Sequence, residues 1–261
     1  MKYSSALLLS LLAATAGAAP PFVPHGTPID EAYRGQFGTC DATDRFGTVQ
    51  FPIRKANGKI AWYGCKSDPS RLVRLERIAA DGDVPAAVIW ESKIAHDLDG
   101  SPAACNTPGT TDQCPTTLML KPTTLHPCPK VLKGTRPDCL PVDASKIAYA
   151  VMPAAAPKGI DGTRFAQLTG LRAGDVGVVI ANGKVVPAII ADTGPAYKIG
   201  EGSTALLAAL SSDGKPRTLA RGVVFVMFPG SSLGKSPNPD TLAAQVAAKG
   251  LALYQRLPRS P

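Results

Sequence analysis

The sequence predicts a mainly β fold (α+β): a compact antiparallel or mixed β-barrel with peripheral helices, stabilised by disulfides. Short β-branched runs outnumber helical segments, and they do not alternate with helices as the strands of a parallel sheet would. The 261 residues include six cysteines, 25 glycines and 25 prolines. Such a loop-rich composition favours one or two globular domains in which cystines supplement a small core.

The first 18 residues are typical of a secretory signal peptide. Lys2 precedes an apolar run from Ala6 to Ala14, and the small residues Ala16-Gly17-Ala18 follow. No later run reaches the ~20 apolar residues of a transmembrane helix. We therefore expect a secreted protein, extracellular or periplasmic, with no membrane partner. The expected organisation is a signal peptide (1–18), an N-terminal lead-in and cystine-containing segment (19–80) and a catalytic domain (81–261), which could be one domain with the preceding segment.

Periodicity predicts the elements of the first half of the chain. Val49–Phe51 and Ile60–Tyr63 flank Asn57-Gly58, a pattern that predicts a β-hairpin. Ser70–Ala80 repeats apolar residues at helical spacing with arginines opposite them, so we expect an amphipathic helix. Its basic face suits solvent better than nucleic acid, and no nucleic-acid partner is expected. A strand follows at Val84–Glu91.

The second half begins with a long region rich in Pro, Cys and Gly, from Asp97 to Asp143, in which we expect only short ordered pieces. Asn-Gly at residues 182–183 joins two β-branched runs and predicts a hairpin, in which Pro187 suits an edge or a bulge. We expect further strands at Ile147–Met152, Asp175–Ile180, Val185–Ile190 and Gly222–Phe228. We expect helices at Ser203–Leu210 and Asp240–Leu257, capped by Ser203 and Asp240.

The even number of cysteines in an exported chain predicts three disulfides. Six cysteines allow 15 pairings, and proximity favours Cys40–Cys65, Cys105–Cys114 and Cys128–Cys139. A zinc site is the competing interpretation, but the chain has no CxxC pair or histidine at metal-ligand spacing. The histidines, His25, His96 and His126, are scattered, and we expect no metal ion and no cofactor. The sequence also has no nucleophile elbow, phosphate loop or dinucleotide fingerprint.

Two carboxylates, Asp192 and Glu201, lie in a glycine-rich connection between an apolar strand and a helix. Asp192 follows the strand and Glu201 precedes the helix. Hydrolysis of a glycosidic bond needs one protonated and one ionised carboxyl group on either side of the substrate, and this pair could supply both. The alternative is an Asp-Thr-Gly-Pro turn with Glu201 as a charge at the start of the helix.

Four segments of the chain, read in order, resemble the blocks of the family 75 glycoside hydrolases, which are secreted chitosanases of fungi and bacteria. They are ESKIAHDLDGSPAAC, DASKIAYAVMP, GDVGVVIANGKVVPAIIADTGPAYKIGEGSTALLAAL and GVVFVMFPGS. The resemblance covers about residues 84–232 and leaves the last helix unmatched. Its most specific element is the Asp-Thr block followed by Gly-Glu-x-Ser. One departure is Ala191-Asp192-Thr193-Gly194-Pro195, where the fungal pattern has Gly-Asp-Thr-Asn-Gly.

The resemblance implies that Asp192 and Glu201 are the essential carboxylates of an inverting enzyme, whose carboxyl groups lie about 6.5–9.5 Å apart. We take Glu201 as the acid and Asp192 as the base. Asp97-Leu98-Asp99-Gly100 matches an acidic block that could bind an amine, bind a cation or form an Asx turn. Thr193 and Ser203 could support the pair, and Thr193 and Tyr197 could also contact the sugar.

The charge balance argues partly against this substrate. The net charge is +8, or +7 without Lys2, and a basic protein repels polycationic chitosan at long range. The segment Glu91–Asp112 carries a local charge of −3, and distant charges are screened beyond ~8 Å. Three hypotheses follow: an endo-acting, inverting β-1,4-glucosaminidase acting as a monomer; a hydrolase of another cell-wall amino-sugar polymer, such as peptidoglycan or partly acetylated chitin; and a glycan-binding module without catalysis.

Overall fold

The computed structural model describes residues 21–29, 50–54, 60–64, 72–106, 113–134, 136–153, 165–194, 198–234 and 237–259. The predicted signal peptide, Tyr197 and the predicted Cys40–Cys65 disulfide lie outside these residues.

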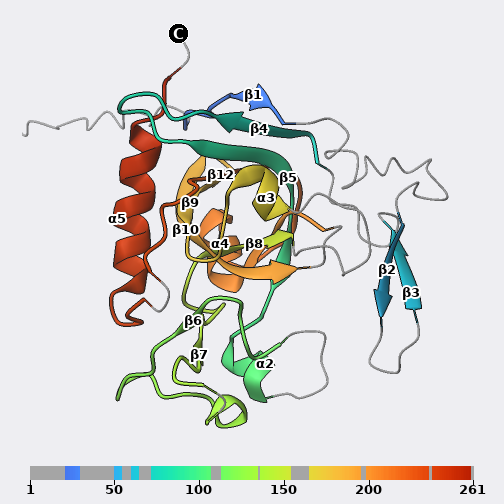
Figure 1. Cartoon of the computed structure of the whole chain (residues 1–261), viewed down its shortest axis with the longest axis vertical. Coiled ribbons are helices and arrows are strands. Elements are labelled where there is room, and N and C mark those ends of the chain that lie inside the picture. Colours follow the sequence, from blue (N-terminus) through green and yellow to red (C-terminus); the bar gives the residue numbers. More distant parts are fainter. Residues whose placement is uncertain are drawn as a thin grey trace, which may run out of the picture.

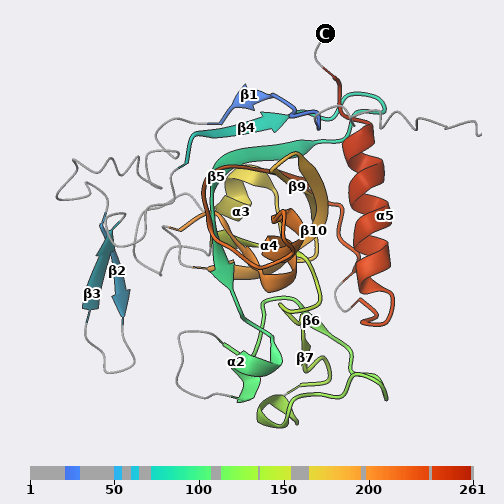
Figure 2. The same cartoon turned by 180° about the vertical axis from the view of Figure 1, so that it is seen from behind.

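Six strands close into a barrel, as predicted (Figures 1 and 2). In order around the barrel they are β5 (Ala87–Asp97), β11 (Glu201–Ser203), β8 (Tyr149–Pro153), β10 (Lys184–Gly194), β9 (Val176–Ala181) and β12 (Leu219–Met227). β12 pairs back with β5 and completes the ring. The barrel is mixed, because β5–β11 and β8–β10 are parallel and the other pairs are antiparallel.

The β9–β10 hairpin confirms the Asn-Gly prediction. Asn182 has a φ of 51° and Gly183 a φ of 72°, the left-handed backbone that a two-residue hairpin turn of this type requires. Pro187 pairs with Val178 of β9, and the pairing of β10 with β8 begins only at Ile189. Its missing N–H therefore falls where β10 has a neighbour on one side, consistent with the expected edge position.

The predicted helix over residues 70–80 is wrong. Arg74–Ile78 is strand β4, which pairs antiparallel with the first half of β5 through a tight connection at Asp81–Val84. A short strand, β1 (Thr27–Pro28), pairs with its other edge. Apolar residues three positions apart fit either structure over so short a segment, and pairing with β5 overrides the local helical preference.

Outside the barrel, β2 (Gln50–Arg54) and β3 (Ile60–Gly64) form the predicted antiparallel hairpin as a separate sheet. The region 97–143 has the expected short elements: α2 (Pro102–Asn106), β6 (Met119–Leu120), η1 (Lys130–Leu132) and β7 (Leu140–Pro141), with β6 paired to β7. The Cys105–Cys114 and Cys128–Cys139 disulfides are present as predicted.

Three further helices pack against the barrel: α3 (Phe165–Thr169) and α4 (Thr204–Leu210), whose residues join the core cluster of Trp90, and α5 (Leu242–Gln255) on the outside (Figure 1). Ser203 caps α4 by accepting a hydrogen bond from the Leu206 amide, as predicted. The predicted cap of α5 is wrong. Its N-cap position is Thr241, and the Asp240 carboxylate instead lies 3.2 Å from Nε2 of His126, a contact between distant segments that local sequence does not reveal.

The core has layers on both sides of the barrel wall. Trp90 stacks on Phe225 and meets the edge of Phe165 in one cluster. The alternate residues Tyr149, Val151, Ile189 and Ala191 belong to a second cluster that packs against Leu242 and Val246 of α5. α5 runs along the outside of the ring (Figure 1). None of the helices in the described part of the chain is long and apolar enough to span a bilayer.

Candidate active site

Asp192 and Glu201 lie on two different neighbours of one central strand. Asp192 of β10 and Glu201 of β11 are both in register with Val151 of β8. Residues in register across a sheet project to the same face, so both carboxylates flank the Val151 side chain. Neighbouring strands are about 4.8 Å apart, so the two backbones are separated by roughly 10 Å. The barrel thus juxtaposes two side chains that the sequence places in one connection.

The position of Gly194 locates the Glu201 carboxylate more closely. A Cβ at Gly194 would lie 2.8 Å from Oε2 of Glu201 and 3.3 Å from the Val151 side chain. The Glu201 side chain therefore extends across β8 towards β10 and reaches Gly194, two residues beyond Asp192. Two strand residues span about 7 Å, which is the backbone distance from Asp192 to the residue that Oε2 of Glu201 approaches.

Glu201 is fixed by the backbone before it and by a lysine. Gly200 has a φ of 85°, and a Cβ there would lie 2.3 Å from the Lys93 carbonyl oxygen, so glycine is required for the strand to begin so close to β5. Nζ of Lys198 lies 2.5 Å from Oε1 of Glu201, and both side chains are largely buried. The residue is therefore held from two sides, with Oε2 turned towards Gly194.

Asp192 follows an irregularity in β10. The register with β8 shifts between Ile190 and Asp192, and such a bulge re-aims the side chain that follows it. Only 7% of Asp192 is exposed. Thr117 fixes the Asp192 carboxylate: the backbone amide and the hydroxyl of Thr117 each donate a hydrogen bond of 2.8 Å to Oδ1 of Asp192. The Thr117 and Thr193 hydroxyls are also 2.8 Å apart.

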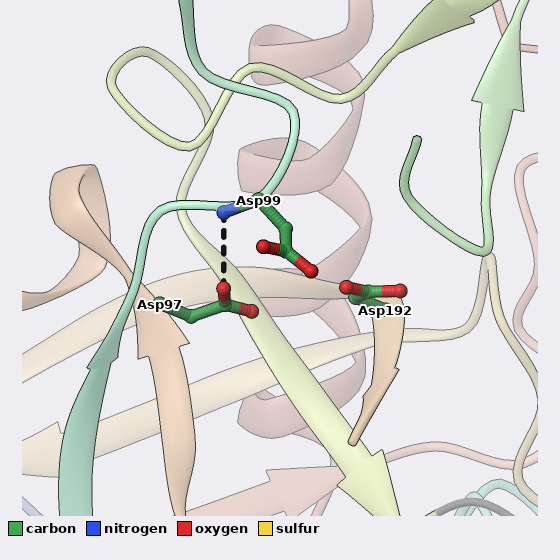
Figure 3. Close-up of side chains that lie close together, drawn as sticks. All are labelled: Asp97, Asp99 and Asp192. Carbon is green, nitrogen blue, oxygen red and sulfur yellow. Dashed lines mark hydrogen bonds between the residues drawn. The ribbon is translucent and has the colours of Figure 1, made fainter. Parts of the chain in front are cut away.

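Asp97 and Asp99 complete an acidic cluster with Asp192 (Figure 3). One oxygen atom from each of the three carboxyl groups lies within 4.8 Å of the others. Oδ1 of Asp97 accepts a hydrogen bond of 3.0 Å from the Asp99 amide, the Asx turn that was one predicted role of this block. The turn does not exhaust the role of these residues, because both carboxyl groups also face Asp192. Such a cluster suits a cation, including an ammonium group, but carboxylates alone do not define a metal site.

Burial and crowding change the acidity of this cluster. Burial, reinforced by the charges of Asp192 and Glu201, raises the pKa of Asp97 to about 6, although the hydrogen bond from the Asp99 amide opposes this. Burial and the neighbouring Asp97 and Asp192 raise the pKa of Asp99 to about 8, against the hydrogen bond from the Gln113 amide. The buried Tyr149 hydroxyl donates to the Asp99 carbonyl oxygen at 2.9 Å, and its own pKa is raised by burial. At neutral pH the Asp99 carboxyl group beside Asp192 is therefore protonated.

These shifts predict that stability decreases as pH rises from about 4 to about 8. The folded chain keeps protons on Asp97 and Asp99 in a range where the unfolded chain, with an ordinary value of 3.8, releases them. The contribution is complete below about pH 4 and is lost as pH rises through the two folded pKa values. Urea denaturation of the Asp97→Asn/Asp99→Asn variant should show a weaker decline between pH 5 and pH 8 than the unmodified protein.

Asp213 provides the control. Its hydrogen bond from Ser211 lowers the pKa to about 2, so the carboxylate is ionised throughout this range. Asp213→Asn should leave the slope between pH 5 and pH 8 unchanged. An identical slope in the Asp97/Asp99 double variant and in the unmodified protein would contradict the assignment.

The structure brings together most of the residues predicted from the sequence. Asp97, Asp99, Asp192, Thr193 and Glu201 surround one region. The Ser203 hydroxyl links β11 to the start of β8 by accepting a hydrogen bond from the Tyr149 amide. Sequence reasoning missed three contacting residues, namely Thr117, Tyr149 and Lys198. Of these, only Lys198 carried a signal, because it precedes Glu201 by three residues.

Asp192 and Glu201 are the two carboxyl-bearing residues in register with Val151, and glycoside hydrolases use paired carboxyl groups. Residues 97–256, more than half of the chain, match the family described as fungal chitosanase of glycosyl hydrolase group 75. The protein belongs to this chitosanase family of glycoside hydrolases. The match extends through α5, which the resemblance of sequence blocks had left out, and begins at Asp97. A comparison with curated protein sequences found no match.

Proposed function

We propose that this protein is a secreted, endo-acting hydrolase that cleaves β-1,4 bonds of chitosan with inversion of configuration. The observation that carries the proposal is the common register of Asp192 and Glu201 with Val151. This register puts one strand, β8, between the two residues, and the proposed inversion requires about 6.5–9.5 Å between their carboxyl groups, which leaves room for a water molecule. The family match supports chitosan as the substrate.

In the proposed mechanism Asp192 is the base and Glu201 is the acid. Oδ1 of Asp192 accepts two hydrogen bonds from Thr117, and the Asp99 side chain contacts the same carboxyl group; as the base, this carboxylate would take a proton from water. Water then attacks the anomeric carbon as Glu201 protonates the leaving oxygen. Lys198 contacts Oε1 of Glu201, and Oε2 faces Gly194.

The two assignments can be separated with substrate analogues. A variant that lacks the acid should still cleave a glycoside whose leaving group needs no protonation, such as a dinitrophenyl glycoside, whereas a variant that lacks the base should be rescued by azide. Reversed behaviour of Glu201→Gln and Asp192→Asn would exchange the roles. The anomer released first, read by NMR, tests inversion directly.

The acidic cluster supports a polycationic substrate despite the net charge of +8. The carboxyl groups of Asp97, Asp99, Asp192 and Glu201 are gathered in one region, and those that are ionised oppose the long-range repulsion there. The net charge itself favours a second candidate, hydrolysis of a neutral or anionic wall polymer such as peptidoglycan. Incubation with chitosans of graded acetylation and with peptidoglycan, followed by mass spectrometry of the products, distinguishes the two. Binding without product release would favour a binding module.

Export through the predicted signal peptide would place the chain in an oxidising compartment, which is consistent with its two described disulfides. We expect a monomer that acts without a cofactor. Tyr197 stays a predicted sugar contact.

If Asp97 pairs with a substrate ammonium group, Asp97→Asn should weaken binding of fully deacetylated oligomers by up to about tenfold, the effect of a contact worth about 1.4 kcal/mol. Acetylated oligomers should bind almost unchanged, because they carry no ammonium group. At neutral pH the effect of Asp99→Asn should be smaller, because its pKa of about 8 leaves that group protonated. Calorimetric titration with both oligomer classes checks this, and equal losses for the two classes would exclude amine recognition.

A further inference from the structure

Thr117 donates two hydrogen bonds to Asp192, although it lies 75 positions away in the sequence. Its amide and hydroxyl converge on the same oxygen of Asp192, each at 2.8 Å. The same short segment continues to hold β10, because the Leu118 amide donates to the Ala191 carbonyl oxygen at 2.8 Å. Three consecutive contacts thus attach residues 117–118 to the strand that carries Asp192.

The segment is itself anchored on both sides of Thr117. Before it, the Cys105–Cys114 disulfide ties it to α2, and the Gln113 amide donates to Oδ1 of Asp99 at 2.5 Å. Beside it, the buried Thr116 hydroxyl accepts from the Val142 amide at 3.0 Å and donates to the Leu118 carbonyl oxygen at 2.6 Å. Thr117 is therefore presented to Asp192 by a braced backbone.

The hydrogen-bond directions follow from the number of protons. A threonine hydroxyl has one proton, and that of Thr117 is donated to Asp192. The contact of 2.8 Å between the Thr117 and Thr193 hydroxyls must then be donated by Thr193. The chain of donors runs from Thr193 through Thr117 to Asp192, and it leaves the Thr193 oxygen with only acceptor capacity for a substrate donor.

We infer that Thr117 is a positioning residue that fixes Oδ1 of Asp192 and thereby orients this carboxylate for the attacking water, and that it orients the Thr193 hydroxyl as an acceptor. This inference rests on the proposed function, in which Asp192 is the base. Thr117 touches neither the water nor the sugar in this arrangement. It acts through Asp192 and Thr193, and its loss should affect kcat more than KM.

Thr117→Val tests the inference, because valine has the shape of threonine and keeps the backbone donor while the hydroxyl is removed. We expect kcat on chitosan to fall roughly 10- to 100-fold, the range for one hydrogen bond to a charged group, with KM changed by less than about threefold. Thr117→Ser keeps the hydroxyl and should restore kcat, a rescue that a purely steric role would not give.

Two further variants make the outcomes distinguishable. Thr123→Val, in the same disulfide-rich region but away from the carboxylates, should leave kcat and KM unchanged. In an Asp192→Asn background Thr117→Val should have no additional effect. An inactive Asp192→Asn with a fully active Thr117→Val, or a Thr117→Ser as impaired as Thr117→Val, would overturn the positioning role alone. An active Asp192→Asn would overturn the proposed function and the inference together.

Discussion

Asp192→Asn and Glu201→Gln should each lower kcat on chitosan by at least about 100-fold, the usual effect of removing a general acid or base. Both replacements keep the size of the side chain and one acceptor oxygen, so the fold should be preserved. Asp192→Asn retains an oxygen for the two Thr117 donors. Initial rates of reducing-end release from chitosan measure the loss, and circular dichroism checks folding.

Asp143→Asn is a suitable control for these two variants. Asp143 is also partly buried and accepts hydrogen bonds from Ser145, but it lies in a turn and is not one of the site carboxylates. It should retain nearly full activity. Near wild-type rates for both Asp192→Asn and Glu201→Gln would show that the pair is not catalytic, whatever the family of the chain.

Gly200→Ala should damage both stability and activity. The positive φ at this position costs a non-glycine residue about 1–3 kcal/mol, and the new methyl would lie 2.3 Å from the Lys93 carbonyl oxygen and 2.5 Å from the Ser92 hydroxyl. We expect a total loss of about 2–6 kcal/mol, because overpacking against backbone adds about 1–3 kcal/mol to the strain of about 1–3 kcal/mol. Relief of the clash would displace β11 and with it Glu201.

Gly214→Ala separates strain from crowding. Gly214 has a φ of 71°, and a Cβ there would meet no atom within 4 Å. This variant should lose only about 1–2 kcal/mol, the cost of the left-handed backbone, and should keep its activity. Thermal unfolding and chitosan hydrolysis of the two variants provide the comparison. Equal destabilisation by both alanines would mean that the contact with Lys93 is easily relieved.

Local patterns predicted the barrel and most of its strands because these signals are carried by neighbouring residues. Asn182-Gly183 specifies its turn through two left-handed residues, and the β-branched runs on either side alternate between two apolar layers. The prediction of a helix for residues 70–80 was wrong because the three-residue spacing of their apolar side chains occurs in a short strand as well as in a helix. The choice depends on the unpaired edge of β5, which is not visible in the segment itself.

The acidic pair was predicted from spacing and resemblance, but its surroundings were not. Thr117 lies in a region with no periodicity, and its contact with Asp192 is created by the path of a chain held by disulfides. Tyr149 read as an ordinary strand residue, and its hydroxyl reaches the Asp99 carbonyl only in the folded barrel. Long-range contacts of single side chains leave no pattern in one sequence.

The register of Asp192 and Glu201 with Val151 also bears on how such an enzyme could evolve. Under the proposed mechanism, the distance that decides inversion is set by one intervening strand. A retaining mechanism needs carboxyl groups about 5–5.5 Å apart, close to the spacing of adjacent strands. A point mutation cannot delete β8 from a closed ring, whereas Asp97, Thr193 and the loops above them can change freely. Descendants of this barrel would therefore acquire new substrates more readily than a new stereochemical outcome.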